Sequence, residues 1–290
     1  MQLGVWLAAM RPRTWPASLV PVVVGLAVAA GAGRVDAFIA IATIVSALAL
    51  QVTTNLANDY WDHARGIDHG ERLGPVRATQ SGLLAPEAVR RAVWISLTVA
   101  VVAGVPLVWR GGVPIVLIGL TSMLCAVAYS AGPYPLASLG LGELLAFVFF
   151  GLVAVAGTTY LHLAHVPAAA LLAGAAVGCF AAAIMSVNNL RDIPTDAPAG
   201  KRTLAVRIGV ERARVLYGVL LASAFLLAVV LAVYEGRWGP LSVGLVAPLA
   251  VNEVRAVAAR RGAELNLSLA GTARLELLFG ALLAAGLVAG

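Results

Sequence analysis

Two stretches of the sequence place an asparagine four residues before an aspartate, as Asn55 with Asp59 and Asn188 with Asp192. Residues four apart on a helix lie on one face, so each stretch is expected to present a strip of oxygen atoms. Further polar residues extend the strips, namely Asn58, Asp62 and Asp68 in the first and Asn189 and Asp196 in the second. The spacing therefore predicts two oxygen-rich helix ends that face each other.

A basic segment that contains glycine follows each strip, RLGPVRATQSG over residues 72–82 and GKRTLAVRIG over residues 200–209. We call residues 55–82 the first motif and residues 188–209 the second motif. The basic residues singled out within them are Arg65, Arg72, Arg77, Lys201 and Arg202. The two motifs thus share an order, with acidic residues first and basic residues after them.

Aspartates gathered at one place repel one another, and a divalent cation removes that conflict. Oxygen ligands favour Mg²⁺, which keeps coordination positions open for the oxygens of substrate phosphates. Arginine and lysine side chains nearby then bind the remaining phosphate charge. Together the motifs predict a magnesium-dependent site for a diphosphate.

The elements that position these residues are indicated by the composition. Of the 290 residues, 61% are hydrophobic and 12% are charged, whereas soluble globular proteins are about 45–50% apolar and about 25% charged. Too few polar residues remain to coat a soluble surface, and the same figures exclude disorder. The composition therefore predicts a protein that crosses the bilayer several times.

Other classes of site and partner are disfavoured. The net charge is +6, but the charges lie in short loops between apolar runs, so no nucleic-acid partner is predicted. Cys125 and Cys179 each lie inside an apolar run, and the sequence has no CxxC and no Cys/His cluster. A structural zinc site and a disulfide framework are therefore not supported.

Nine apolar runs are long enough to be transmembrane helices, for which about 20 residues are needed. The last two are interrupted by polar residues and are the weaker signals. The predicted spans are 15–32, 37–57, 92–109, 113–129, 144–161, 166–187, 215–234, 238–258 and 270–289.

The basic residues predict the orientation of these spans. With the N-terminus in the cytoplasm, only Arg34, Arg110 and Arg237 lie outside, so 17 of the 20 basic residues face the cytoplasm. This matches the positive-inside rule. We expect a multi-pass protein of the cell membrane with an uncleaved first span and with both motif loops cytoplasmic.

The motifs lie four spans apart, which indicates a repeat with halves at about 15–130 and 141–260 in a single domain of residues 1–290. One asparagine–aspartate pair at a helix end is explained by capping and solvation, but two pairs in register with the topology favour a site. A diphosphate at the mouth of an apolar helix bundle points to a lipid diphosphate whose tail lies among the helices. Tyr129 and Glu143, near the same membrane face, are weaker candidates for substrate binding.

At these motifs the sequence resembles the UbiA superfamily of intramembrane prenyltransferases, and most closely its MenA-type branch. The likeness rests on both motifs, on Arg11-Pro12-Arg13-Thr14 and on the segment 140–160. It thins after about residue 215. Many relatives have Tyr-xxx-Lys after the fourth helix, but this chain has Tyr129 and Pro133, so Arg72, Lys201 or Arg202 must supply what that lysine does.

The resemblance implies an all-α bundle of about nine transmembrane helices with a central cavity capped by two cytoplasmic loops. It also implies Mg²⁺-dependent transfer of a polyprenyl group from its diphosphate to 1,4-dihydroxy-2-naphthoate, with loss of the carboxylate, in menaquinone biosynthesis. The implied metal ligands are Asn55, Asp59, Asp62, Asn188, Asp192 and Asp196, of which the four aspartates are catalytic. The residues implied for the diphosphate are Asn58, Arg65, Asp68, Arg72, Arg77, Asn189, Lys201 and Arg202.

Two alternatives remain open at this point. Another aromatic acceptor, such as 4-hydroxybenzoate, homogentisate, haem or chlorophyllide, would use similar aspartate strips, and the residue chemistry does not name the ring. A secondary transporter would also carry internal repeats and acids within the membrane, although transporter sites usually lie near the bilayer midplane rather than at helix ends. The prenyl chain length and the oligomeric state are not predicted.

Overall fold

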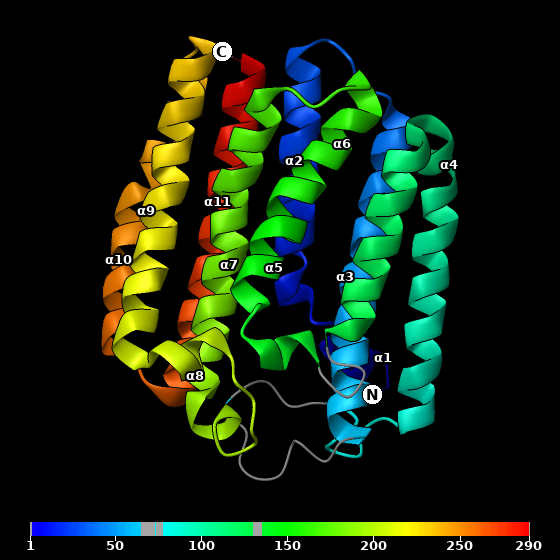
Figure 1. The fold of residues 1–290 in the computed structure, drawn as a ribbon, viewed down its shortest axis with the longest axis vertical. Helices are drawn as coiled ribbons and strands as arrows, with labels where there is room; N and C mark the ends of the chain where they lie inside the picture. The colour runs from blue at the N-terminus through cyan, green and yellow to red at the C-terminus, as the bar shows by residue number, and fades with distance from the viewer. Residues whose placement is uncertain (1, 65–72, 74–77, 130–134, 290) are drawn as a thin grey trace.

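The computed structural model describes residues 2–64, 73, 78–129 and 135–289, and every regular element in these ranges is helical. The predicted all-α class is confirmed. Figure 1 shows the long helices running side by side, with α9 and α10 at one side and α3 and α4 at the other. In chain order the elements are α1 (Gln2–Met10), η1 (Pro12–Thr14), α2 (Pro16–Gly31), α3 (Ala37–Ala64), α4 (Pro86–Ala128), η2 (Leu136–Leu139), α5 (Gly142–Phe147), η3 (Val148–Val153), α6 (Ala154–Leu163), α7 (Ala168–Asp196), α8 (Leu204–Ile208), α9 (Val210–Glu235), η4 (Gly239–Val246), α10 (Ala247–Ala259), η5 (Gly262–Glu264) and α11 (Leu265–Ala289).

Seven helical segments among the described residues are long and apolar enough to cross a bilayer, or eight if the bent pair Leu3–Thr14 and Pro16–Gly31 is one span. One of the seven is α4, whose 43 residues are broken at Gly112, where φ is 63° and ψ is −148°. Essentially only glycine adopts these angles. The arms before and after Gly112 correspond to the separately predicted spans 92–109 and 113–129, so each of the nine predicted spans overlaps a helical segment.

The chain bends sharply before its first long helix. Helices on either side of Trp15 meet at 51°, and Arg11 at the start of the bend has a left-handed φ of 51°. Pro12 and Pro16 each occupy a first helical position, where the missing N–H group costs nothing. The bend brings residues 11–14 back toward α3.

Helix α7 is the central element of the bundle. It packs against α2, α9, α11 and the α5–η3 segment. In its apolar stretch 67% is buried inside the protein, the largest share among the candidate spans of the described residues. Gly151 of η3 packs closely on Gly178 of α7, because a Cβ on Gly151 would collide with the backbone of Gly178 and a Cβ on Gly178 would collide with the carbonyl of Phe147. Small residues at such crossings let helices approach closely in a membrane.

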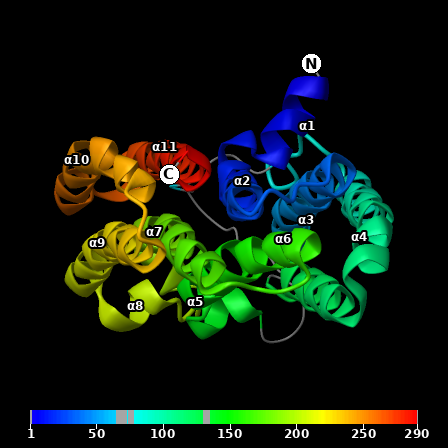
Figure 2. The ribbon, with the colours of Figure 1, turned by 90° about the horizontal axis from the view of Figure 1, so that it is seen from above.

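The two predicted motifs begin at one end of the bundle. Helices α3 and α7 both run toward the lower end in Figure 1, where α1 and α8 also lie, while α11 ends at the opposite end. Seen from above, α2 and α6 lie between α7 and α11 on one side and α3 and α4 on the other (Figure 2). We call the end where α3 and α7 terminate the motif end.

Candidate active site

Lys201 lies near one carboxylate from each motif. Its Nζ atom lies 3.9 Å from Oδ2 of Asp62 in α3 and 3.7 Å from Oδ1 of Asp196 at the end of α7. Helix α7 therefore delivers Asp196, and the turn after it delivers Lys201, to the end of α3. Two carboxylates from distant parts of the chain thus face one positive charge, so the donor set here fits a cation.

Asp59, one turn before Asp62, is engaged by the backbone. Its side chain is 2% exposed, and it accepts hydrogen bonds from the N–H groups of Ala78 at 3.1 Å and Thr79 at 3.4 Å. This fixes the end of the first motif against α3. An ionised carboxylate has about four lone-pair sites, so these two bonds leave room for a further ligand.

Asp192 of the second motif has a different environment. Both of its oxygens accept from the neighbouring Arg191, from Nε at 2.7 Å and from the terminal nitrogen NH2 at 2.6 Å. Arg191 is 2% exposed and also donates to Oδ1 of Asn188 at 2.8 Å. The predicted ligands Asn188 and Asp192 are therefore held together by one buried guanidinium group.

A third element joins this cluster from the far end of the sequence. Arg191 donates to Oδ1 of Asn266 in α11 at 2.7 Å, and Nδ2 of Asn266 donates to the carbonyl of Leu73 at 2.7 Å. Asn266 thereby links the second motif to the first. The sequence analysis missed Asn266, because it stands alone at the start of a weak span.

Asn55 points toward the N-terminal bend. It is 4% exposed, and its Nδ2 donates to the carbonyl of Met10 at 3.1 Å and to Oγ1 of Thr14 at 2.9 Å. Asn58 lies about one turn further along α3. The amide nitrogen of Asn55 thus anchors residues 10–14 to α3.

The weaker candidates lie on the α5 side of the motif end. Nδ2 of Asn189 donates to Oε1 of buried Glu143 at 2.9 Å, and the hydroxyl of Tyr129 donates to Sδ of Met185 at 3.3 Å. Burial, followed by the charges of Glu143, Asp196 and Asp62, raises the pKa of the Tyr129 phenol. Tyr129 therefore stays protonated at neutral pH and lies near carboxylates of both motifs.

The remaining predicted residues are Arg202 and four residues of the first motif. Arg202 is exposed, while Arg65, Asp68, Arg72 and Arg77 lie outside the described residues. Within the described ranges, no group of three or more His, Cys, Asp or Glu side chains is close enough to hold a metal ion. Among the described residues, Asp196 lies within electrostatic range of both Asp192 and Asp62, and it shares Lys201 with Asp62.

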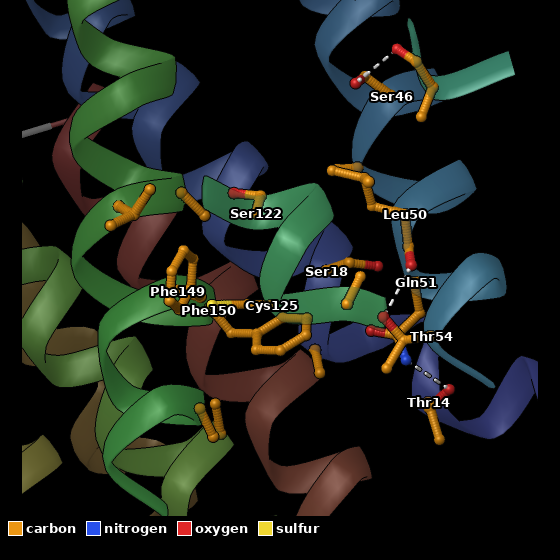
Figure 3. A pocket seen from close by; sticks show the side chains of 18 of the residues that line it. Thr14, Ser18, Ser46, Leu50, Gln51, Thr54, Ser122, Cys125, Phe149 and Phe150 are labelled. Atoms are coloured by element: carbon orange, nitrogen blue, oxygen red, sulfur yellow. Dashed lines mark hydrogen bonds between the residues drawn. The ribbon is translucent and has the colours of Figure 1, made fainter. Parts of the chain in front are cut away.

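A cavity of about 1180 Å³ extends through the bundle, and the motif residues Asn55, Asn58, Asn188 and Arg191 line it. Near the motif end its wall is polar and includes Thr14, Gln51 and Thr54 (Figure 3). The lining residues further along are largely apolar and come from α4, η3 and α6, including Leu107, Ile115, Phe150 and Leu161. The cavity can hold a molecule with a charged head and a long apolar tail.

Comparisons with known proteins agree with this architecture. Residues 18–289 match the model of the UbiA prenyltransferase family. The chain is similar to 1,4-dihydroxy-2-naphthoate octaprenyltransferase of Mycobacterium tuberculosis, with 39% identity over 98% of this chain and 96% of the relative. It is 34% identical to the enzyme of that name from Escherichia coli, over 87% of this chain and 84% of the relative.

Solved structures show the same fold. A UbiA homolog from Archaeoglobus fulgidus bound to GPP and Mg²⁺ superposes with a TM-score of 0.68 and 18% identity, over 99% of this chain and 100% of that chain. A homolog from Aeropyrum pernix gives 0.69 and 18%, over 94% of this chain and 97% of that chain. With nearly its whole length covered by the family model, the chain belongs to the UbiA prenyltransferase family.

Proposed function

We propose that this protein transfers a polyprenyl group from polyprenyl diphosphate to 1,4-dihydroxy-2-naphthoate in menaquinone biosynthesis. The product is demethylmenaquinone in its quinol form, and the ring carboxylate leaves as CO₂. The observation that carries the proposal is the pair of carboxylates facing Lys201, from the same two motifs whose Asn55, Asn58 and Asn188 line a long, largely apolar cavity. The acceptor is named on the 31–40% identity to 1,4-dihydroxy-2-naphthoate octaprenyltransferases over most of the chain.

Asp62 and Asp196 are the residues that would hold Mg²⁺, with Asp59, Asn55, Asn188 and Asp192 proposed as further ligands. When bound, the metal would neutralise the diphosphate and make it a better leaving group. Lys201 lies between the two carboxylates, 18% exposed, and is positioned to bind diphosphate oxygens. The proposed diphosphate contacts also include Asn58, Asn189, Arg202, and Arg65, Asp68, Arg72 and Arg77 outside the described residues.

The chain supports ionisation of the allylic C–O bond in two ways. Positive charge at the motif end stabilises the departing diphosphate, and electrostatic stabilisation of this kind is usually the largest catalytic contribution. The apolar wall formed by residues such as Leu107 and Ile115 excludes water, which would otherwise capture the allylic cation. The electron-rich ring carbon then bonds to that cation.

We further propose that the motif end faces the cytoplasm of a cell that carries the protein in its plasma membrane. The distribution of arginines favours this orientation. We also propose that the chain is one domain built from two related halves, at about 15–130 and 141–260, each of which contributes one motif.

Detergent-purified protein tests the proposal. It is incubated with a polyprenyl diphosphate and 1,4-dihydroxy-2-naphthoate, with Mg²⁺ or excess chelator, and lipid extracts are analysed by mass spectrometry. A prenylated, decarboxylated naphthoquinol that forms only with Mg²⁺ supports the proposal. Prenylation of another ring from a panel overturns the acceptor, and ion-driven uptake into proteoliposomes without any transfer would favour a transporter.

A further inference from the structure

Gln51 occupies the polar end of the cavity, one helical turn before Asn55 on the same face of α3. Its side chain is 7% exposed, and the residue lines the cavity together with Thr14, Thr54 and Asn55. Figure 3 shows Gln51 beside Thr14, on the α3 wall, with Cys125, Phe149 and Phe150 of the other walls in the same view. A polar amide therefore lies in a cavity whose other walls carry aromatic rings.

The hydroxyl group of Thr14 determines how this amide is turned. Thr14 donates its single proton to the carbonyl of Arg11 at 2.9 Å. Its Oγ1 accepts from Nε2 of Gln51 at 3.2 Å and from Nδ2 of Asn55 at 2.9 Å. A hydroxyl offers one donor and two acceptor sites, so all three are used and both amides must direct their NH₂ groups toward Thr14.

In this arrangement the Oε1 atom of Gln51 points away from Thr14 and receives no hydrogen bond from it. It is buried and accepts no hydrogen bond from the parts of the chain that the structure describes. Most buried side-chain polar atoms in native proteins have a partner. The turned amide thus leaves a fixed acceptor atom without a donor among the described residues, on a side chain that lines the cavity.

We propose that Oε1 of Gln51 accepts a hydrogen bond from a ring hydroxyl of the aromatic acceptor, and that it distinguishes hydroxylated rings from rings that lack this group. The inference rests on the proposed function, since it names a contact for the acceptor of that reaction. A carboxylate has no proton to offer to this atom, so the recognised group is the hydroxyl and not the acid of the ring.

This contact strengthens during the proposed reaction. The ring carbon forms a bond to the allylic carbon while the C–O bond to diphosphate breaks, and the electron pair of that bond leaves with diphosphate. Positive charge then spreads to the hydroxyl oxygen, whose proton remains and becomes a stronger donor. Loss of CO₂ returns an electron pair to the ring. Gln51→Met should therefore lower kcat as well as weaken acceptor binding.

Binding measurements on the full-length protein in detergent test the contact without requiring turnover. The probes are 1,4-dihydroxy-2-naphthoate, 1-hydroxy-2-naphthoate and 4-hydroxy-2-naphthoate, titrated calorimetrically. For the wild type, removal of one of the two hydroxyls should raise Kd about tenfold. In Gln51→Met the same removal should change Kd less than about twofold, because the acceptor atom is gone.

Thr54→Val is the matched control. Thr54 lies on the same wall, but its hydroxyl already donates to the carbonyl of Leu50 at 3.0 Å, so this variant should keep the tenfold preference. Gln51→Leu replaces Gln51→Met if the latter does not fold. Equal Kd values for all three probes in the wild type, or a preference that persists in the Gln51 variants, overturns the inference. A wild type that shows the preference but transfers no prenyl group refutes the proposed function alone.

Discussion

The two motifs share an Asn-xxx-Asp pattern, yet their aspartates are held in different ways. In the first motif Asp59 accepts from two backbone N–H groups, and Asp62 faces Lys201 across 3.9 Å. In the second motif Asp192 is bound through both oxygens by the buried guanidinium of Arg191. The same spacing thus gives one carboxylate tied to a loop, one facing an ammonium group and one in a buried ion pair.

The way each aspartate is held predicts how much its removal should affect stability as well as catalysis. Asp62 and Asp196 face Lys201 at 3.9 and 3.7 Å, beyond hydrogen-bond distance, and their side chains are 9% and 13% exposed. Asp192 neutralises an arginine that is 2% exposed, so its removal leaves a buried charge without its partner. Loss of activity should therefore come with a larger loss of stability at Asp192 than at Asp62 or Asp196.

The largest expected effect is on turnover. Asp62→Ala and Asp192→Ala should each lower prenyl transfer by about 10³-fold or more, because removing one group that stabilises developing charge costs about 10²–10³ in kcat and both residues are proposed to hold the metal as well. Transfer is measured by mass spectrometry of the prenylated product. Wild-type turnover by both variants would refute the metal assignment.

The second expected effect is a difference in stability between these same two variants. Breaking a buried ion pair by removing one partner costs about 3–5 kcal/mol, so Asp192→Ala should unfold more readily than Asp62→Ala in a denaturant titration in micelles. The double variant Arg191→Met/Asp192→Ala removes the unpaired charge and should recover most of that stability without activity. Equal stability of the two single variants would contradict the role given to Arg191.

Lys201 provides a smaller and more specific test. Lys201→Met should lower kcat about tenfold, since the diphosphate loses one positive charge. It should also lower the Mg²⁺ concentration needed for half-maximal activity, because the ammonium group no longer competes for Asp62 and Asp196. Lys201→Arg keeps the charge and serves as the control. An unchanged Mg²⁺ requirement in Lys201→Met would show that Lys201 does not occupy the cation position.

Local sequence patterns predicted the elements of this fold well, because hydropathy and helical spacing act over a few turns. The break at Gly112 follows from the gap between two apolar runs, and the strip from Asn55 to Asp62 follows from the four-residue period. The contacts that distinguish the motifs were not predictable in this way. The hydrogen bond from Asn266 to Leu73 joins residues 193 positions apart. The hydrogen bond from Asn55 to Thr14 depends on the bend before α2.

The helical period that predicts the first strip also applies to Gln51. It lies four residues before Asn55, so the same helical period that defines the first strip places it on the same face. Its function as an acceptor, however, depends on the orientation of its amide. That orientation is set by Thr14, 37 positions away, and only the folded chain shows it.

The smallest expected effect concerns Asp59. Asn in its place keeps one carbonyl oxygen and can still accept from one of the two N–H groups, so Asp59→Asn should lower the free energy of unfolding by about 1 kcal/mol, close to the net value of one hydrogen bond. Asp59→Ala leaves both buried N–H groups unpaired and should cost more. If Asp59 chiefly anchors residues 78–79, Asp59→Asn will reduce transfer far less than Asp62→Ala does. An equal loss of activity in these two variants would instead make Asp59 as important for the metal as Asp62, and the contrast within the first motif would disappear.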